Sequence, residues 1–343
     1  MDASRLLSRL SALAVTISLL VSGLFILLLL VVAQPQLFEE EAVVSVSEWV
    51  PRSVDSDLQR GKKGNQIKLG YLLISESSKW IGPQALKKDQ RYAGNNLACK
   101  NCHLKNGKQA GAGSWVGVTK RFPQFRGREN KVGTIEERVN GCMERSMNGR
   151  VLPIESREMK AIVAYMEWLS ENVPEERLAE FKGYPKLDIP EMVADPMIGK
   201  SVYEAECQLC HGADGQGIRL ADTTKGYQYP PLWGKDTYNH GAGMHRVLTA
   251  AQFIKYNMPY LQADADNPKL SDEEAYHVAA YINSFDRPKK SNPERDFPDL
   301  KLKPVSTPYG PWEDDFSPEQ HKYGPFQPII AYYEETFDIK KSK

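Results

Sequence analysis

The sequence predicts a mainly α-helical protein in which two domains of one kind follow each other behind an apolar N-terminal helix. Two observations predict the tandem: the pattern C-x-x-C-H occurs at residues 99–103 and 207–211, and each copy is followed by a Gly- and Pro-containing stretch and then by a segment with helical periodicity. A third observation, an uncharged and mostly aliphatic run from about residue 11 to residue 33, predicts the leading helix. The predicted divisions are an N-terminal segment at 1–34, domains at 35–185 and 186–290, and a C-terminal arm at 291–343.

The N-terminal segment has the order of an export signal, because Arg5 and Arg9 precede the apolar run. The run is longer than the roughly 7–15 residues of a cleaved signal and close to the ~20 that span a bilayer. Its length favours an uncleaved anchor, whereas Val31-Val32-Ala33 also fits a cleavage site. Both alternatives put the rest of the chain outside the cytoplasm, so we expect a periplasmic protein. The formal net charge of zero gives no indication of nucleic-acid binding.

The two C-x-x-C-H patterns are the attachment signature of c-type haem. They comprise Cys99, Cys102 and His103 in the first copy and Cys207, Cys210 and His211 in the second. Two thiols one turn apart can bond the vinyl groups of one porphyrin, and the adjacent histidine can then bind the iron. A zinc site or a thioredoxin-like pair also uses paired cysteines, but neither requires a histidine after each pair. We therefore predict two covalently bound haems c, with His103 and His211 as iron ligands.

A helix closes each predicted domain. In the first, apolar residues share one face of a helix at about 155–172, bounded by Ser156 and Pro174; they are Met159, Ile162, Val163, Met166 and Leu169. In the second, Ser271 is the expected N-cap of a helix that runs to about Phe285, before Pro288. The order of helix, C-x-x-C-H, loops and closing helix resembles class I cytochrome c, present here twice, with 174–190 as the linker.

The segments 35–68 and 288–343 are rich in charge or Pro and have weak periodicity. We interpret them as extended arms that lie over the domains, with Trp312, Phe326 and Tyr332 as aromatic anchors. The same composition also fits partial disorder, so both interpretations stay open.

The second axial ligand of the His211 haem is predicted to be Met258. In class I cytochromes a distal Met comes from the loop before the closing helix, and here that loop holds Asn257-Met258-Pro259. Met244 is the alternative, although a Met is also a common filler of apolar cores.

The corresponding loop of the first domain has no Met-Pro, but it contains Cys142, the one cysteine outside the two motifs. An unpaired thiol in an exported protein calls for an explanation. We predict that Cys142 is a thiolate ligand of the His103 haem; Met143 or Met147 as ligand, a buried free thiol and an intermolecular disulfide are the alternatives. A thiolate adds negative charge to the iron, which an electron carrier seldom needs but which suits an enzyme that brings reactive sulfur next to iron.

Charge is distributed unequally between the two predicted haem sites. Residues 119–150 contain eight basic and four acidic side chains, whereas residues 190–287 contain eight basic and thirteen acidic ones. Solvation explains most surface charge, but a basic region around the Cys142 haem suits an anionic substrate, since Arg binds oxyanions through two parallel hydrogen bonds. An acidic second domain suits docking of a basic redox partner.

Three segments carry a resemblance to a known family. Residues 114–118 (SWVGV), 121–126 (RFPQFR) and above all 133–149 (GTIEERVNGCMERSMNG) closely resemble the dihaem thiosulfate dehydrogenase/tetrathionate reductase family, and the likeness extends over roughly 60–290. It implies the reversible reaction 2 thiosulfate = tetrathionate + 2 electrons. It also implies that the His/Cys haem is the active site and that a His/Met haem passes the electrons to a small c-type cytochrome or another periplasmic redox partner.

The resemblance also implies roles for individual residues. Cys142 matches the ligand cysteine, and Arg138, Ser146 and Arg128 match residues that line the substrate pocket, although Arg126 lies close enough to Arg128 to leave that match ambiguous. Some members carry a Lys directly before the Met ligand; here Asn257 stands there, which favours simple His211/Met258 ligation and leaves the physiological direction open. A dihaem electron carrier of the cytochrome c4 kind and an oxidase of another small anion are the alternatives to this function.

Overall fold

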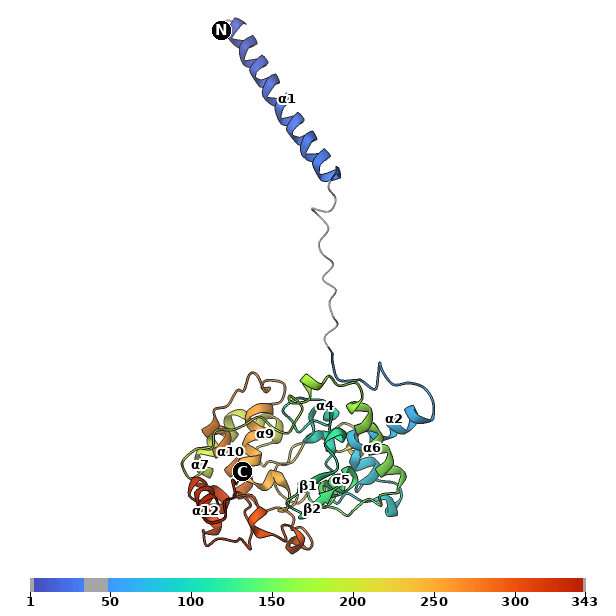
Figure 1. Cartoon of the computed structure of the whole chain (residues 1–343), viewed down its shortest axis with the longest axis vertical. Coiled ribbons are helices and arrows are strands. Elements are labelled where there is room, and N and C mark those ends of the chain that lie inside the picture. Colours follow the sequence, from blue (N-terminus) through green and yellow to red (C-terminus); the bar gives the residue numbers. More distant parts are fainter. Residues whose placement is uncertain (1–2, 34–48, 342–343) are drawn as a thin grey trace. The chain divides into compact units, whose positions relative to one another are not determined.

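The computed structural model describes residues 3–33 and 49–341, which divide into two units between Val50 and Pro51 (Figure 1). The first unit holds α1 (Ala3–Ala33), an apolar helix long enough to cross a membrane. A signal sequence meets the same criterion, so α1 fits both alternatives for the N-terminal segment. The predicted extended arm at 35–68 lies in part outside the described residues, and the prediction is wrong for 62–68, which form the start of a packed helix, α2 (Lys62–Ser75).

The second unit contains two groups of helices (Figure 1). The first comprises α2 (Lys62–Ser75), α3 (Ser77–Ile81), α4 (Leu104–Gly107), α5 (Ile135–Glu144) and α6 (Arg157–Ser170), with the antiparallel strands β1 (Gln124–Arg126) and β2 (Lys131–Gly133). The second comprises α7 (Pro196–Glu206), α8 (Gln208–His211), α9 (Val247–Asn257) and α10 (Asp272–Ser284), with the antiparallel strands β3 (Ile218–Arg219) and β4 (Tyr227–Tyr229), and is followed by α11 (Pro318–Tyr323) and α12 (Gln327–Phe337).

The two groups repeat one packing arrangement, in which α2 packs on α6 and α7 packs on α10. A glycine lies at each crossing. A Cβ on Gly70 would lie 2.0 Å from the carbonyl oxygen of Ala161, and a Cβ on Gly199 would lie 2.0 Å from that of His277. Only glycine allows two backbones to approach so closely. The same close contact in both domains supports the internal repeat.

Both closing helices begin at the predicted caps. The Ser156 hydroxyl accepts a hydrogen bond from the Met159 amide, and Ser271 forms a capping box with Glu274. All five apolar residues predicted for the inner face of α6 are buried. Each closing helix therefore covers the core of its own domain.

The described part of the C-terminal arm packs on the core of the second domain. Phe326 is fully buried there, and Tyr332 is partly buried against the same cluster. The Trp312 ring stacks on the His321 ring with centroids 4.4 Å apart. Of the two interpretations that the sequence leaves open for this arm, the packed one agrees with these aromatic contacts.

Candidate functional site

Two cavities lie beside the two C-x-x-C-H motifs, with volumes of about 270 and 360 Å³. The first is bordered by the predicted ligand set Cys99, Cys102, His103 and Cys142, and the second by Cys207, Cys210, His211 and Met258. Most other lining side chains are apolar, as expected for a prosthetic group that is largely buried.

The histidines and cysteines at these cavities fit covalent haem. Nδ1 of His103 is hydrogen-bonded to the carbonyl oxygen of Gly113 at 2.7 Å, and Nδ1 of His211 to that of Pro230 at 2.8 Å. A backbone carbonyl on Nδ1 orients the ring and leaves Nε2 for a metal. The four motif cysteines are unpaired thiols, which thioether formation requires.

The two cavities adjoin each other. Four residues line both of them: Leu97, Cys102, Tyr238 and Met244. Two haems bound in these cavities would contact the same four side chains. This proximity suits transfer of electrons from one haem to the other.

Cys142 lies on α5, whose first turn is fixed by a capping box between Thr134 and Glu137. Arg138 and Cys142 are four residues apart and therefore share one face of the helix. Nη1 of Arg138 donates a hydrogen bond to Sγ of Cys142 at 3.1 Å. Ser146, one turn further on, lines the same cavity. The structure thus brings together three of the four predicted catalytic residues.

The charges around Cys142 favour its thiolate. Burial acts to raise the pKa of this thiol, but the Arg138 charge, a hydrogen bond with His103 and the Arg145 charge together lower it to about 6. Burial instead raises the pKa of Cys99 to about 11 and that of Cys102 to about 12. These charges therefore favour the Cys142 thiolate, which is the form that binds metals and attacks as a nucleophile.

The alternative ligands of the first haem are close to Cys142. Met143 and Met147 also line the first cavity, and both are nearly fully buried in the core of the first domain. Cys142 differs from them in its contacts with the Arg138 guanidinium and the His103 ring. Of the two methionines predicted for the second haem, Met258 follows directly on α9 and Met244 lies where the cavities adjoin.

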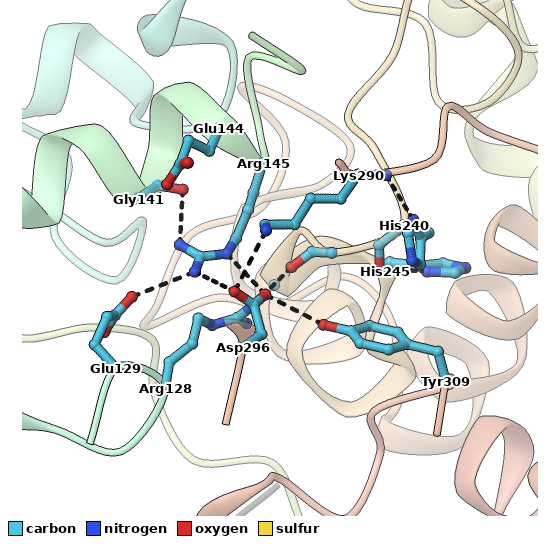
Figure 2. Close-up of polar contacts among 12 residues, drawn as sticks. Arg128, Glu129, Gly141, Glu144, Arg145, His240, His245, Lys290, Asp296 and Tyr309 are labelled. Atoms are coloured by element: carbon cyan, nitrogen blue, oxygen red, sulfur yellow. Dashed lines mark hydrogen bonds and ion pairs between the residues drawn. The ribbon is translucent and has the colours of Figure 1, made fainter. Parts of the chain in front are cut away.

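Arg128, the fourth predicted catalytic residue, lies in a neighbouring buried cluster (Figure 2). Its Nη1 donates to the carbonyl oxygen of Gly241 at 2.8 Å and to Oδ2 of Asp296 at 2.7 Å. Arg126, which the resemblance leaves as an alternative, donates a hydrogen bond to Glu129 at 3.1 Å. Burial and the Arg138 charge lower the pKa of Arg126, and the negative charges of Glu129 and Cys142 partly oppose this shift. Both arginines thus stay predictions for the substrate site.

Asp296 holds this cluster together and belongs to the C-terminal arm. Besides Arg128, its carboxylate accepts hydrogen bonds from Nη2 and Nε of Arg145 at 2.6 and 3.0 Å, and it lies 3.6 Å from Nζ of Lys290 (Figure 2). Arg145 in turn donates to the carbonyl oxygen of Gly141, the residue before Cys142, at 3.1 Å. The arm therefore supports the helix that presents Cys142.

The sequence assigned no role to Asp296 or Arg246, and it indicated Arg145 only as one of eight basic residues around Cys142. Arg246 precedes α9; burial and the charge of Arg128 lower its pKa to about 9, and Arg138 acts in the same direction. No carboxylate lies within 4.0 Å of its guanidinium among the residues that the structure describes. In the sequence, Arg246 is recognisable only as a basic residue directly before an apolar helix. This pattern does not indicate which residues its side chain contacts.

Replacing Asp296 with Asn is expected to destabilise the protein by about 3–5 kcal/mol, because it leaves buried cations without their counter-ion. The Asp296 side chain is 2% exposed. Burial acts to raise its pKa, but the hydrogen bond from Arg145 and the charge of Arg128 lower it overall. This stabilisation is therefore fully present above the unfolded pKa of about 3.9 and is lost as the pH falls through the lower folded value.

Urea denaturation followed by circular dichroism measures the Asp296 effect, with Glu129→Gln as control. Glu129 is 28% exposed, so its loss should cost less than about 1 kcal/mol. Equal midpoints for the Asp296→Asn and Glu129→Gln proteins would contradict the central role of Asp296.

Comparisons with known proteins agree with this geometry. A family model described as SoxA/TsdA, cytochrome c domain, matches residues 88–174, and one described as cytochrome c matches residues 197–286. The predicted fold of two tandem cytochrome c domains is thereby confirmed, as are the two covalently bound haems c.

Curated relatives and a solved structure extend the likeness. A thiosulfate dehydrogenase of Stutzerimonas stutzeri (strain A1501) is 36% identical over 255 residues, covering 74% of this chain and 78% of that protein. One of Allochromatium vinosum is 43% identical over 209 residues, covering 60% of this chain and 75% of that protein. The solved thiosulfate dehydrogenase (TsdBA) of Marichromatium purpuratum, in its "as isolated" form, matches with a TM-score of 0.63 and 37% identity; the match covers 71% of this chain and half of that one.

Proposed function

The chain belongs to the thiosulfate dehydrogenase family, and from this premise we propose that it oxidises thiosulfate to tetrathionate at Cys142. The observation that carries the proposal is the Arg138–Cys142 contact of 3.1 Å in the wall of the first cavity. It places a fixed cation against the Cys142 thiol, whose pKa that cation lowers, beside a C-x-x-C-H motif. An electron carrier has no use for such a pair, so this contact favours an enzyme over a carrier of the cytochrome c4 kind.

The proposed reaction joins two dianions. Two thiosulfates lose two electrons in total and form one sulfur–sulfur bond, which gives one tetrathionate dianion. The two haems, when bound, supply iron that accepts these electrons one at a time. Bringing two dianions together in a partly desolvated cavity costs several kcal/mol of repulsion. We propose that Arg138, together with Arg128 or Arg126, offsets this repulsion and that the Ser146 hydroxyl donates a hydrogen bond.

Cys142, which would hold the iron of the first haem, is also proposed to carry sulfur covalently. Its thiolate and the terminal sulfur of one thiosulfate together lose two electrons and form a sulfur–sulfur bond. A second thiosulfate then attacks that terminal sulfur, forms the central bond of tetrathionate and displaces Cys142 as the thiolate. Arg138 stabilises the thiolate at both ends of this sequence, since its guanidinium contacts Sγ directly.

An assay in both directions tests the proposed function. The purified protein with both haems is mixed with thiosulfate and an oxidised acceptor, and separately with tetrathionate and a reduced donor. We expect thiosulfate-dependent reduction of the acceptor, and the ratio of the two rates gives the catalytic bias. A protein that exchanges electrons with both redox dyes but responds to neither sulfur compound would be an electron carrier, and a response only to another small anion would reassign the substrate.

Replacing Arg138 with Gln is expected to lower kcat/KM for thiosulfate by about 10²–10³-fold, the usual effect of losing one preorganised donor to developing charge. The substitution removes the hydrogen bond to Cys142 and one positive charge. Steady-state kinetics of Arg150→Gln, which removes an equal charge from an exposed residue, provides the control. A similar small loss in both variants would mean that general charge, and not the contact with Cys142, sets the rate.

We further propose that the protein works in the periplasm, held at the inner membrane if α1 is retained, and that the second domain passes electrons to a basic cytochrome or a similar partner. The excess of acidic residues at 190–287 supports this orientation. Turnover with a basic cytochrome should therefore fall as ionic strength rises, because salt screens the attraction that speeds encounter. Turnover with a neutral dye is the control, and an equal salt response of both acceptors would contradict the docking proposal.

A further inference from the structure

The buried side-chain amide of Asn257 connects the Met258 segment of the second haem site with residues 109–113 of the first domain. Asn257 is the last residue of α9, directly before Met258, and is 0% exposed. Its Nδ2 donates to the carbonyl oxygen of Gly111 at 3.0 Å and to that of Phe253 at 3.1 Å, and its Oδ1 accepts from Nε2 of Gln109 at 2.9 Å. Two of these three bonds cross to the first domain, over 146 and 148 residues of chain.

The first-domain partners belong to the loop that orients the proximal histidine. Gly113, two residues after Gly111, is the residue whose carbonyl oxygen is bonded to Nδ1 of His103 at 2.7 Å. One short loop, residues 109–113, therefore contacts the His103 ring at one end and the residue before Met258 at the other.

Close packing holds this loop against the second domain and the linker that precedes it. Gly111 has φ +70°, and a Cβ there would lie only 3.3 Å from Cβ of Ala265 and 3.3 Å from Cδ of Pro185. Ala112 is buried in a small apolar cluster with Phe253, against which Met258 packs. The loop therefore has little room to shift without moving the Met258 segment as well.

We infer that Asn257 is a positioning residue that holds Met258 at the second haem and couples that ligand to the His103 loop. This inference rests on the Met258 ligation proposed for the second haem. The Asn257 side-chain amide uses both N–H groups and one oxygen lone pair in hydrogen bonds to three partners, Gly111, Phe253 and Gln109. These three bonds fix the orientation of the amide. An apolar residue of the same size would fill the space but would fix neither the end of α9 nor the cross-domain contact.

The test replaces Asn257 with Leu in the full chain with both haems attached. We expect most molecules of the variant to lose the charge-transfer absorption that is characteristic of Met-ligated ferric haem. We also expect a lower midpoint potential for the second haem, because a Met ligand raises the potential. We also expect a shift in the electron paramagnetic resonance signal of the first haem, since the loop that orients His103 loses a contact.

Asn239→Leu is the matched control. Asn239 is also a buried amide that joins the two domains: its Nδ2 donates to the carbonyl oxygen of Glu144 at 2.8 Å and to Oδ1 of Asn148 at 3.1 Å, but neither partner lies in the Met258 or the 109–113 loop. It should weaken the interface without changing the second haem spectrum. If Asn257→Leu does not fold, Gln109→Leu removes one cross-domain bond at a less buried residue and should lower the same midpoint potential by a smaller amount.

The outcomes separate this inference from the ligation on which it rests. A spectrum of the second haem that changes with Met258→Gly but not with Asn257→Leu or Gln109→Leu overturns the positioning role alone. A spectrum that Met258→Gly leaves unchanged overturns both the ligation and the inference. Equal spectral changes in Asn239→Leu and Asn257→Leu would show that any loosening of the interface suffices, which also overturns it.

Discussion

Replacing Cys142 with Gly is expected to abolish thiosulfate-dependent reduction of an acceptor, with a loss on the order of a thousandfold or more, as for other nucleophiles that act together with their partners. Both haems should stay attached, because their thioethers come from the other four cysteines. The variant loses the thiolate that Arg138 contacts at 3.1 Å and with it the atom that carries sulfur in the proposed reaction. Mass spectrometry of the intact protein and acceptor reduction measure the two expectations separately.

Met143→Leu and Met147→Leu are the matched comparisons for Cys142→Gly. Both methionines line the first cavity, and exchange of Met for Leu nearly conserves volume. Either change should cost far less activity than loss of Cys142. A Cys142→Gly protein that retains turnover, with Met143→Leu or Met147→Leu inactive, would move the ligand and the active site to a methionine.

Replacing Met258 with Gly is expected to remove the Met-ligated signature of the second haem and to slow transfer of electrons to an external acceptor. The loss of the thioether lowers the reduction potential of that haem. Met258 lines only the second cavity, and Cys142 lines only the first. Sulfur chemistry at Cys142 should therefore persist for a single turnover. Rapid-mixing spectroscopy without acceptor, followed by steady-state turnover, distinguishes the two steps.

Met244→Leu serves as the comparison for Met258→Gly, because Met244 is the alternative ligand and lines both cavities. It should leave the Met-ligated signature in place. Loss of that signature in Met244→Leu and its survival in Met258→Gly would exchange the roles of the two methionines.

Much of the fold follows from local patterns in the sequence. The apolar stripe of α6 and the Ser156 and Ser271 caps are short-range features, and the structure confirms all of them. The strands β1 to β4 were not predicted, because pairs of two or three residues leave no alternation to detect. Packing of the C-terminal arm was open for a related reason: its aromatic anchors are isolated, so periodicity does not indicate which surface they cover.

The candidate site was predictable where its residues lie close together in the sequence. The family resemblance implied roles for Arg138, Cys142 and Ser146, which lie close together in the sequence; Arg138 and Cys142 are on α5, Ser146 is in the turn after it, and all three line one cavity. The Arg128–Asp296 pair joins residues 168 positions apart, and the Asn257–Gly111 bond spans 146. Neither contact leaves a local pattern, since each depends on how the arm and the two domains pack. The sequence therefore predicted candidate reacting groups but not the residues that hold them in place.

We propose that Cys142 joins two thiosulfates and that the haems held in the two adjoining cavities accept the electrons. The most direct test is a product balance for the wild-type protein, in which thiosulfate consumed, tetrathionate formed and electrons delivered to an acceptor are measured in the same reaction. We expect two thiosulfates to be consumed and two electrons to be delivered for each tetrathionate formed. Electrons delivered with sulfite or sulfate as the product, or no electrons delivered from thiosulfate at all, would contradict it.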